Sequence, residues 1–277
     1  MSTQKKHYDV PYGYRAKAGL IVVGPNLNPT PEISRILPEY IQIRETRVHM
    51  DPVVNVAECS KLSDTLAEGA RLISEGLCSP VIGNRSVMAF ACTAGSLAGG
   101  PGWDKKEIEI MEKATAHCDC EHWTPGVGAK QGKSIPSTTT ATAAEEAMRF
   151  MGMKKICLAG PYIDEISKAF KVFYEASGFQ VLNVAGLGIE DLFEMGATRP
   201  SDAYKIAMQA LVPEADGIFI TCTNFRCTDI IEELEQATGK IVITSNQATA
   251  WHLMKLLGIN DVVEGYGKLL RKTPRFA

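Results

Sequence analysis

Strand-like and helix-like segments alternate along almost the whole chain. Short runs of β-branched and aromatic residues, such as residues 18–23 and 217–221, are typical of buried strands. The stretches between them, such as residues 60–76, place apolar side chains on one face, as an amphipathic helix does. This alternation predicts parallel sheets with helices on both faces, and therefore an α/β protein.

One local pattern occurs twice, about 130 residues apart. An apolar, strand-like run leads into Cys92-Thr93 in the first half and into Cys222-Thr223 in the second. A thiol therefore follows the carboxyl end of a strand in each half, which is where ligands bind in open parallel sheets. N–H groups at the start of the next helix can hold an anion there and lower the pKa of the thiol. We expect the two thiols to face one another across a small anionic substrate.

The repeated pattern predicts two pseudo-symmetric Rossmann-like domains, each a parallel sheet flanked by helices, with the active site in the cleft between them. A length of 277 residues suits two medium domains. We expect residues 1–134 and 247–277 to form the first α/β domain, which carries Cys92. Residues 135–246 are expected to form the second, which carries Cys222. The chain lacks a Walker or Rossmann glycine fingerprint, and no cofactor is predicted.

The charge balance argues against nucleic-acid and membrane partners. The chain has 29 Lys and Arg against 32 Asp and Glu, a formal net charge of −3, so no basic field is expected. No apolar run approaches the roughly 18 residues that a spanning helix needs, and residues 1–19 lack the apolar core of a signal peptide. We expect a cytoplasmic protein that acts on a small carboxylate and forms a homo-oligomer, with a C2 dimer as the default.

The eight cysteines do not indicate a disulfide framework. Cys157 lies in a strand-like run, where a free thiol packs as a small hydrophobic side chain, and a reduced protein fits this better. Cys118 and Cys120 have histidines beside them, but their C-x-C spacing lacks the second pair of a zinc ribbon. No metal site is therefore predicted.

Polar residues follow other predicted strands as well. Asn26 is either a turn residue with local hydrogen bonds or part of a site at the strand end. Tyr162 either packs as a partly buried aromatic or donates its hydroxyl to a carboxylate. The glycine-rich residues 96–104 form either a mobile lid or a long surface turn. The residues alone leave these alternatives open.

Two facing thiols can perform two cofactor-free reactions. One thiolate can take a proton from the carbon next to a carboxylate while the other thiol returns one to the opposite face, which is racemisation. Alternatively, a thiolate adds to an electron-poor alkene, the bond becomes single and rotates, and the double bond reforms. Both reactions build an enediolate that N–H, hydroxyl and amide donors would stabilise. The side chains available for this are Asn26, Thr93, Ser96, Tyr162, Thr223 and Asn224.

Several motifs along the chain occur together in one known superfamily. They are Leu20-Ile21-Val22, Asn26, Pro31-Glu32, Cys92-Thr93, Pro161-Tyr162-Ile163-Asp164, Gly186-Leu187-Gly188-Ile189, Cys222-Thr223-Asn224, Thr244-Ser245-Asn246 and Gly265-Tyr266-Gly267. This combination resembles the aspartate/glutamate racemase superfamily and, within it, the branch of maleate cis–trans isomerases and arylmalonate decarboxylases. The resemblance covers nearly the whole chain.

The resemblance implies a cofactor-independent isomerase with two catalytic cysteines. Cys92 matches the cysteine that adds to the double bond, and Cys222 matches the one that handles the proton at the other carbon. Arylmalonate decarboxylases have glycine at the position of Cys92, so the presence of both thiols favours isomerisation or racemisation. The residues expected to bind substrate are Asn26, Thr93, Ala94, Tyr162, Thr223 and Asn224.

One position departs from the isomerase pattern. Maleate isomerases carry a carboxylate-binding asparagine where this chain has Leu192, and losing a hydrogen bond to a charged group costs about 1.5–3 kcal/mol. An amino-acid-like or hydantoin-like substrate with one carboxylate therefore competes with maleate. Three alternatives to an isomerase of maleate type stay open. They are an amino-acid or hydantoin racemase, an arylmalonate-type decarboxylase that depends on Cys222 alone, and a non-catalytic carboxylate-binding protein.

Overall fold

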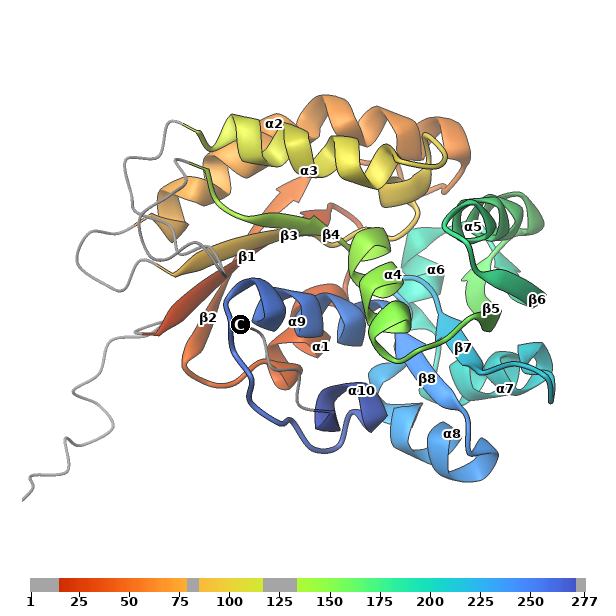
Figure 1. The fold of residues 1–277 in the computed structure, drawn as a ribbon. Coiled ribbons are helices and arrows are strands. Elements are labelled where there is room, and N and C mark those ends of the chain that lie inside the picture. The colour runs from red at the N-terminus through yellow and green to blue at the C-terminus, as the bar shows by residue number, and fades with distance from the viewer. Residues whose placement is uncertain (1–14, 79–84, 117–133, 273–277) are drawn as a thin grey trace, which may run out of the picture.

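Two four-stranded parallel sheets form the framework of the molecule (Figure 1). The structure is a computed structural model, and it describes residues 15–78, 85–116 and 134–272. The first sheet has the order β2-β1-β3-β4. Its strands are β1 (Ala16–Val23), β2 (Ile41–Val48), β3 (Ser86–Phe90) and β4 (Ser137–Thr139).

The second sheet repeats the strand order of the first. Its order is β6-β5-β7-β8, with every neighbouring pair parallel. Its strands are β5 (Lys155–Tyr162), β6 (Gln180–Ile189), β7 (Gly217–Ile220) and β8 (Ile241–Thr244). Strands β3 and β7 thus hold equivalent places, and Cys92 and Cys222 follow their carboxyl ends. The predicted pseudo-symmetric α/β architecture is confirmed.

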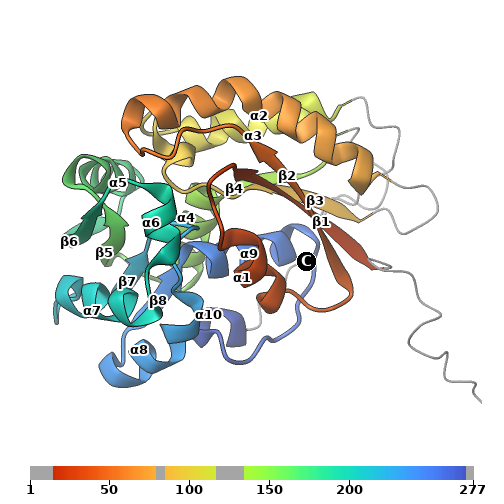
Figure 2. The same cartoon turned by 180° about the vertical axis from the view of Figure 1, so that it is seen from behind.

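Helices cover both faces of each sheet, as the alternating pattern predicts. In the first half α2 and α3 pack together over one face, and α1 and α9 lie on the other (Figures 1 and 2). In the second half α5 and α7 pack on β5 and β6. The helices are α1 (Pro29–Ile36), α2 (Val56–Leu77), α3 (Trp103–Ala114), α4 (Thr140–Phe150), α5 (Asp164–Ala176), α6 (Leu192–Ala197), α7 (Pro200–Ala210), α8 (Ile231–Thr238), α9 (Ser245–Leu256) and α10 (Gly267–Arg271), with 3₁₀ turns η2 (Gly95–Leu97) and η3 (Thr228–Ile230).

Helices α4 and α9 join the two halves. Each follows the last strand of one sheet, and the two helices pack against one another between the sheets (Figure 1). The Thr139 side chain caps α4 by accepting from the N–H of Thr142, and Thr244 caps α9 in the same way from Gln247. The local sequence at each strand end therefore fixes the start of a helix that crosses toward the other half.

Strand β4 lies close to the expected boundary between the two domains. Residues 137–139 pair with β3, so the first sheet includes residues beyond 134. The run of Ser and Thr here supplies the cap of α4, and its lack of apolar residues hides the short strand. The division into two domains stays a prediction.

The segment from 96 to 104 is largely helical turn, not a long loop. Turn η2 follows Cys92 closely, and α3 already begins at Trp103. Gly95 is required here because a Cβ atom would lie 2.9 Å from Cδ1 of Leu62 and 3.0 Å from the Phe90 ring. Among the described residues, no helix is both long and apolar enough to cross a membrane.

Candidate active site

The segments that carry the two predicted thiols lie directly against one another. The hydroxyl of Thr223, next to Cys222, donates a 3.0 Å hydrogen bond to the carbonyl oxygen of Ala91, next to Cys92. On the other side of Cys92, the Thr93 hydroxyl lies 3.0 Å from the Ser245 hydroxyl at the start of α9. The carboxyl ends of the two sheets therefore meet at these cysteines.

Cys92 is held in a tight, buried turn. Its side chain is only 6% exposed, and the N–H of Gly95 lies 3.4 Å from its sulfur. The Ser96 hydroxyl donates to the carbonyl oxygen of Cys92 and fixes the turn. Burial raises the pKa of the Cys92 thiol, the nearby Cys59 thiol raises this pKa further, and the Gly95 N–H lowers it. Cys92 therefore rests as a protonated thiol at neutral pH.

Cys222 has a strained backbone. Its φ is +84°, and it is the one described residue other than glycine with a positive φ. This left-handed conformation costs a residue with a Cβ roughly 1–2 kcal/mol, and such strain clusters at functional sites. The N–H of Phe225 donates to the carbonyl oxygen of Cys222 at 3.3 Å, which closes a turn behind the thiol. Burial raises the pKa of Cys222 to about 11, although the Tyr162 hydroxyl and the N–H groups of Asn224 and Phe225 lower it.

Tyr162 connects the two thiols. It ends strand β5, is 4% exposed, and stacks on Phe170 of α5, with ring centroids 5.3 Å apart. Its hydroxyl hydrogen-bonds the sulfur of Cys222, and burial together with the charges of Cys222 and Cys92 raises the pKa of Tyr162. The phenol is therefore a protonated donor that lies within electrostatic reach of both sulfur atoms.

Asn26 has an unused hydrogen-bonding atom at the same place. Its Nδ2 donates to Thr223 Oγ1 at 3.4 Å, while its buried Oδ1 has no partner among the described residues. Because the Thr223 hydroxyl gives its proton to Ala91, it can only accept from Asn26, which fixes the orientation of the amide. The second N–H of Asn26 stays available to a ligand.

The backbone beside Cys92 offers further donors. The N–H groups of Thr93 and Ala94 donate no hydrogen bond within the described part of the chain. Both residues are buried. Buried N–H groups without a partner are uncommon in native proteins, and two adjacent ones form a place for an oxyanion. The role of Thr93 and Ala94 in binding substrate stays a prediction.

The Asn224 side chain ties segments of the site together, and its expected role in binding substrate stays a prediction. Its Oδ1 accepts from the N–H groups of Leu27 at 2.7 Å and Asn28 at 3.2 Å. Its Nδ2 donates to the carbonyl oxygen of Leu192 at 2.6 Å. Both lone pairs of Oδ1 are therefore occupied by the loop after β1, and the side chain ties the two halves together. The backbone N–H of Asn224, by contrast, points to the sulfur of Cys222.

The N–H groups at both sulfur atoms come from turns, which corrects the expectation of a helix start behind each thiol. The donor at Cys92 begins the short turn η2, and α3 starts only at Trp103. After Cys222 the chain forms an irregular turn, and α8 starts at Ile231.

A buried polar cluster near Cys222 was not predicted. The Glu32 carboxylate accepts hydrogen bonds from Nδ2 of Asn246 at 2.7 Å and from the N–H of Thr228 at 3.4 Å. Burial raises the pKa of Glu32, and the charge of Glu32 in turn raises the pKa of Cys222. The sequence shows Glu32 in a helix's first turn and Asn246 at a strand end, but not that they meet.

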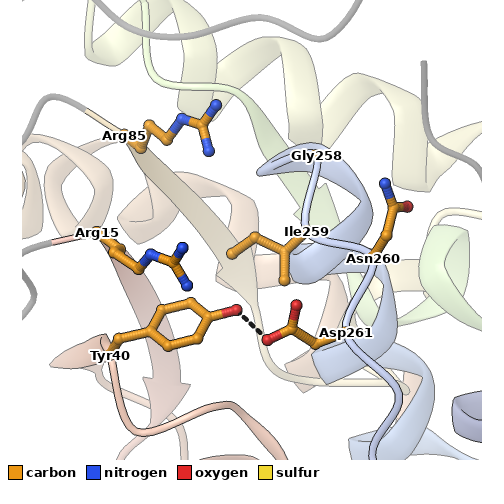
Figure 3. Close-up of a pocket in the computed structure, with 7 residues that line it drawn as sticks. All are labelled: Arg15, Tyr40, Arg85, Gly258, Ile259, Asn260 and Asp261. Atoms are coloured by element: carbon orange, nitrogen blue, oxygen red, sulfur yellow. Dashed lines mark hydrogen bonds between the residues drawn. The ribbon is translucent and has the colours of Figure 1, made fainter.

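A cavity elsewhere in the molecule is separate from the thiols (Figure 3). It has a volume of about 260 Å³ and lies where β1 and β3 begin, at the opposite sheet edge from Cys92. In Figure 3 the guanidinium groups of Arg15 and Arg85 point toward it, and Tyr40 donates to Asp261. Because Cys92 and Cys222 follow the carboxyl ends of their strands, this cavity is not the site of the two-thiol chemistry.

The other described cysteines include both free thiols and a disulfide-bonded residue. Besides the two site cysteines, Cys59, Cys157 and Cys227 carry free thiols. Cys78 is disulfide-bonded, with none of these five as its partner, so the expectation of fully reduced cysteines is wrong there. Among the described residues no group of His, Cys, Asp and Glu could hold a metal ion, and Cys118 and Cys120 lie outside those residues.

Comparisons with known proteins agree with this geometry. The family model for arylmalonate decarboxylase matches residues 127–270, just over half of the chain. A maleate isomerase from Geobacillus stearothermophilus is 24% identical over 263 residues, which cover 92% of this chain and 96% of that protein. The arylmalonate decarboxylase of Bordetella bronchiseptica is 27% identical over 146 residues, which cover 52% of this chain and 61% of that protein.

A solved structure shows the same fold. A cysteine-to-serine variant of Nocardia farcinica maleate cis–trans isomerase, with a covalently bound succinylcysteine intermediate, superposes with a TM-score of 0.81. The match has 19% identity and covers 94% of this chain and 99% of that one. The family model shows that the chain belongs to the arylmalonate decarboxylase family, which confirms the resemblance to the branch of the aspartate/glutamate racemase superfamily that holds arylmalonate decarboxylases and maleate isomerases.

Proposed function

We propose that this protein is a cofactor-independent cis–trans isomerase of a small unsaturated carboxylate, of maleate isomerase type. The observation that carries the proposal is the Thr223–Ala91 contact, which brings Cys92 and Cys222 together in one buried site. Its relatives support the chemistry, because most of those compared are maleate isomerases and one holds a succinylcysteine. In this proposal Cys92 is the nucleophile and Cys222 the acid and base.

The reaction balances once the Cys92 thiol has lost its proton to solvent. The Cys92 thiolate adds to one alkene carbon, and the π electrons move to the other carbon and its carboxylate as an enediolate. Cys222 gives its proton to that carbon, the new single bond rotates, and the Cys222 thiolate takes the proton back. The C–S bond then breaks, and the trans alkene leaves with the thiolate regenerated.

The donors around the two sulfurs suit the enediolate. The N–H groups of Thr93 and Ala94, the Tyr162 hydroxyl and the free N–H of Asn26 all lie in the dry interior, where such donors are most effective. Removing one donor of this kind lowers turnover roughly 100- to 1,000-fold. Thr223 contributes by holding Asn26 and Ala91 in place.

The identity of the second substrate group depends on Leu192. Its side chain is buried, at 4% exposure, at the start of α6, and its backbone is bound by Pro52 and Asn224. If Leu192 faces the substrate, as the resemblance implies, a second carboxylate loses a hydrogen-bond donor there. The variant Leu192→Asn is then expected to raise kcat/KM for maleate about tenfold or more. An unchanged value would remove Leu192 from the site.

Proton NMR with maleate in deuterated water tests the proposal. Fumarate should appear with the wild-type protein and not with Cys92→Ala or Cys222→Ala. Fumarate formation at the wild-type rate in either variant would overturn the two-thiol mechanism. Deuterium entering the α-position of an amino acid or hydantoin, without fumarate, would instead make the protein a racemase.

The family model favours a second candidate, a decarboxylase of arylmalonates. In that reaction only Cys222 is needed, as proton donor to the enediolate that loss of carbon dioxide leaves behind. Carbon dioxide release from an arylmalonate that persists in Cys92→Gly would establish it. A non-catalytic carboxylate-binding protein would give none of these signals. The predictions of no cofactor, a homo-oligomer and a cytoplasmic location are part of the proposal.

A further inference from the structure

Four buried polar atoms between α2 and α3 have no hydrogen-bond partner among the described residues. They are both carboxyl oxygens of Glu107, Nε1 of Trp103 and Oγ of Ser63. The Glu107 side chain is fully buried. An unpaired buried polar group costs about 1–3 kcal/mol, and more if it is charged. A group of them in one place therefore needs a functional explanation.

The four atoms form one cluster. Trp103 and Glu107 are one turn apart on α3, and the Trp103 and Ser63 donors lie near enough to favour the ionised form of Glu107. Neither donor makes a hydrogen bond of ordinary geometry with it. A carboxylate here would be poorly solvated, so the cluster is arranged for a neutral carboxylic acid.

This cluster lies against the turn that holds Cys92. On α2, Cys59, Leu62 and Ser63 occupy one face, because they are spaced i, i+3 and i+4. Leu62 packs on Gly95, whose N–H reaches the Cys92 sulfur. On α3, the Trp103 ring covers Gly99, where a Cβ atom would lie 2.1 Å from the ring. Both helices thus pack the cluster against residues 95–99.

The charge of an ionised Glu107 affects the Cys92 thiol. An ionised Glu107 raises the pKa of both Cys59 and Cys92. Burial, and then the charge of Asp104, raises the pKa of Glu107 itself. Asp104 is held by the Thr142 hydroxyl of α4 at 2.5 Å and pairs with Lys105 at 3.2 Å. Strand β4 and turn η2 also pack on α3, and they contain only Ser and Thr and only Gly, Ser and Leu, respectively.

We propose that Glu107 is a positioning residue for Cys92. The Glu107 carboxyl stays protonated while Cys92 works as a thiolate, and ionisation of Glu107 disfavours the Cys92 thiolate. The inference rests on the proposed function for the role of Cys92 as nucleophile. Glu107 keeps its own proton throughout and exchanges none with the substrate. Two groups coupled in this way hold one negative charge between them far more readily than two.

The test is the pH dependence of Cys92 alkylation by iodoacetamide, followed on the Cys92 peptide by mass spectrometry. In Glu107→Gln the group at this position is always neutral, so the midpoint for Cys92 should lie about one pH unit or more below that of the wild-type protein. Glu107→Asp keeps a titratable carboxyl and should keep the higher midpoint. Equal midpoints in the wild-type protein and Glu107→Gln would overturn the proposal.

Glu112→Gln is the matched control. Glu112 lies on the same helix, is partly buried, and accepts from the N–H of Ser137, away from the cluster. Its replacement should leave the Cys92 midpoint in place, and a shift as large as that of Glu107→Gln would contradict a specific role for Glu107. If Glu107→Gln does not fold, Glu107→Met removes the charge with an apolar side chain of similar size. The assay needs no substrate, so it is independent of whether maleate is isomerised.

Discussion

The N–H of Val54 donates a 2.9 Å hydrogen bond to the carbonyl oxygen of Glu190 and so joins the two halves of the molecule. Val53 pairs with Asp191 as an antiparallel bridge, and the N–H of Leu192 donates to Pro52 at 2.8 Å. These segments follow the carboxyl ends of β2 and β6, the same sheet edges at which the thiols lie. The bridge therefore closes one side of the site.

Opening this bridge should expose both thiols. Val54→Pro removes the N–H donor and about 1 kcal/mol of hydrogen bonding, so alkylation of Cys92 and Cys222 by iodoacetamide should become about fivefold faster. Cys157, buried in β5, is the internal control and should react at its original rate. Equal acceleration of Cys157 would mean general unfolding, and no acceleration at Cys92 or Cys222 would mean that the bridge does not limit access.

Tyr162→Phe should make Cys222 less reactive. The Tyr162 hydroxyl stabilises the Cys222 thiolate and lowers a pKa that burial raises to about 11. Its loss should move the alkylation midpoint of Cys222 upward by about one pH unit, since a hydrogen bond to a charged group contributes about 1.5–3 kcal/mol. An unchanged midpoint, with the fold intact by circular dichroism, would show that the phenol does not act on the thiolate.

The strained backbone of Cys222 predicts an unusual order of stability. At φ +84° a glycine is unstrained, whereas alanine is as strained as cysteine. Cys222→Gly should therefore be more stable than Cys222→Ala by about 1 kcal/mol, although glycine normally destabilises. Thermal or urea unfolding of the two variants checks this. A less stable glycine variant would contradict the strain.

Replacing Asn224 should mainly lower stability, whereas replacing Asn26 should mainly lower activity. Asn224→Ala removes three side-chain hydrogen bonds, two of them between the halves, and should lower the free energy of unfolding by about 2–4 kcal/mol. Asn26→Ala removes one long hydrogen bond, so its main effect should be on kcat/KM. Urea unfolding and steady-state kinetics on both variants separate the two roles. Equal loss of stability would contradict the assignment.

Much of the fold follows from the sequence because buried parallel strands have a strong local signal. Residues 18–23 lie in strand β1, as their apolar pattern predicts, and both Cys-Thr units follow strands. The sequence does not predict strand β4, because its Ser and Thr residues have no apolar neighbours in the sequence. A strand of three residues leaves too little periodicity to detect.

The sequence indicates which residues belong to the candidate site but not which residues they contact. Cys92, Cys222 and Asn26 could be named because each follows a strand, and Tyr162 because it ends one, while their roles stay predictions. The contacts of the Asn224 side chain could not be predicted, since its partners Leu27 and Leu192 come from distant segments. Glu107 was missed for the same reason: its importance arises from burial beside Cys92, which only the packing of α2 and α3 reveals.

The most direct test of the central claim is to trap the covalent intermediate. When Cys222→Ser is incubated with maleate, an adduct formed on Cys92 lacks the thiolate that would remove its proton, so it should accumulate. Peptide mass spectrometry should then find the mass of one substrate added to the Cys92 peptide and to no other cysteine. If the wild-type protein converts maleate but Cys222→Ser carries no adduct on Cys92, the account is contradicted.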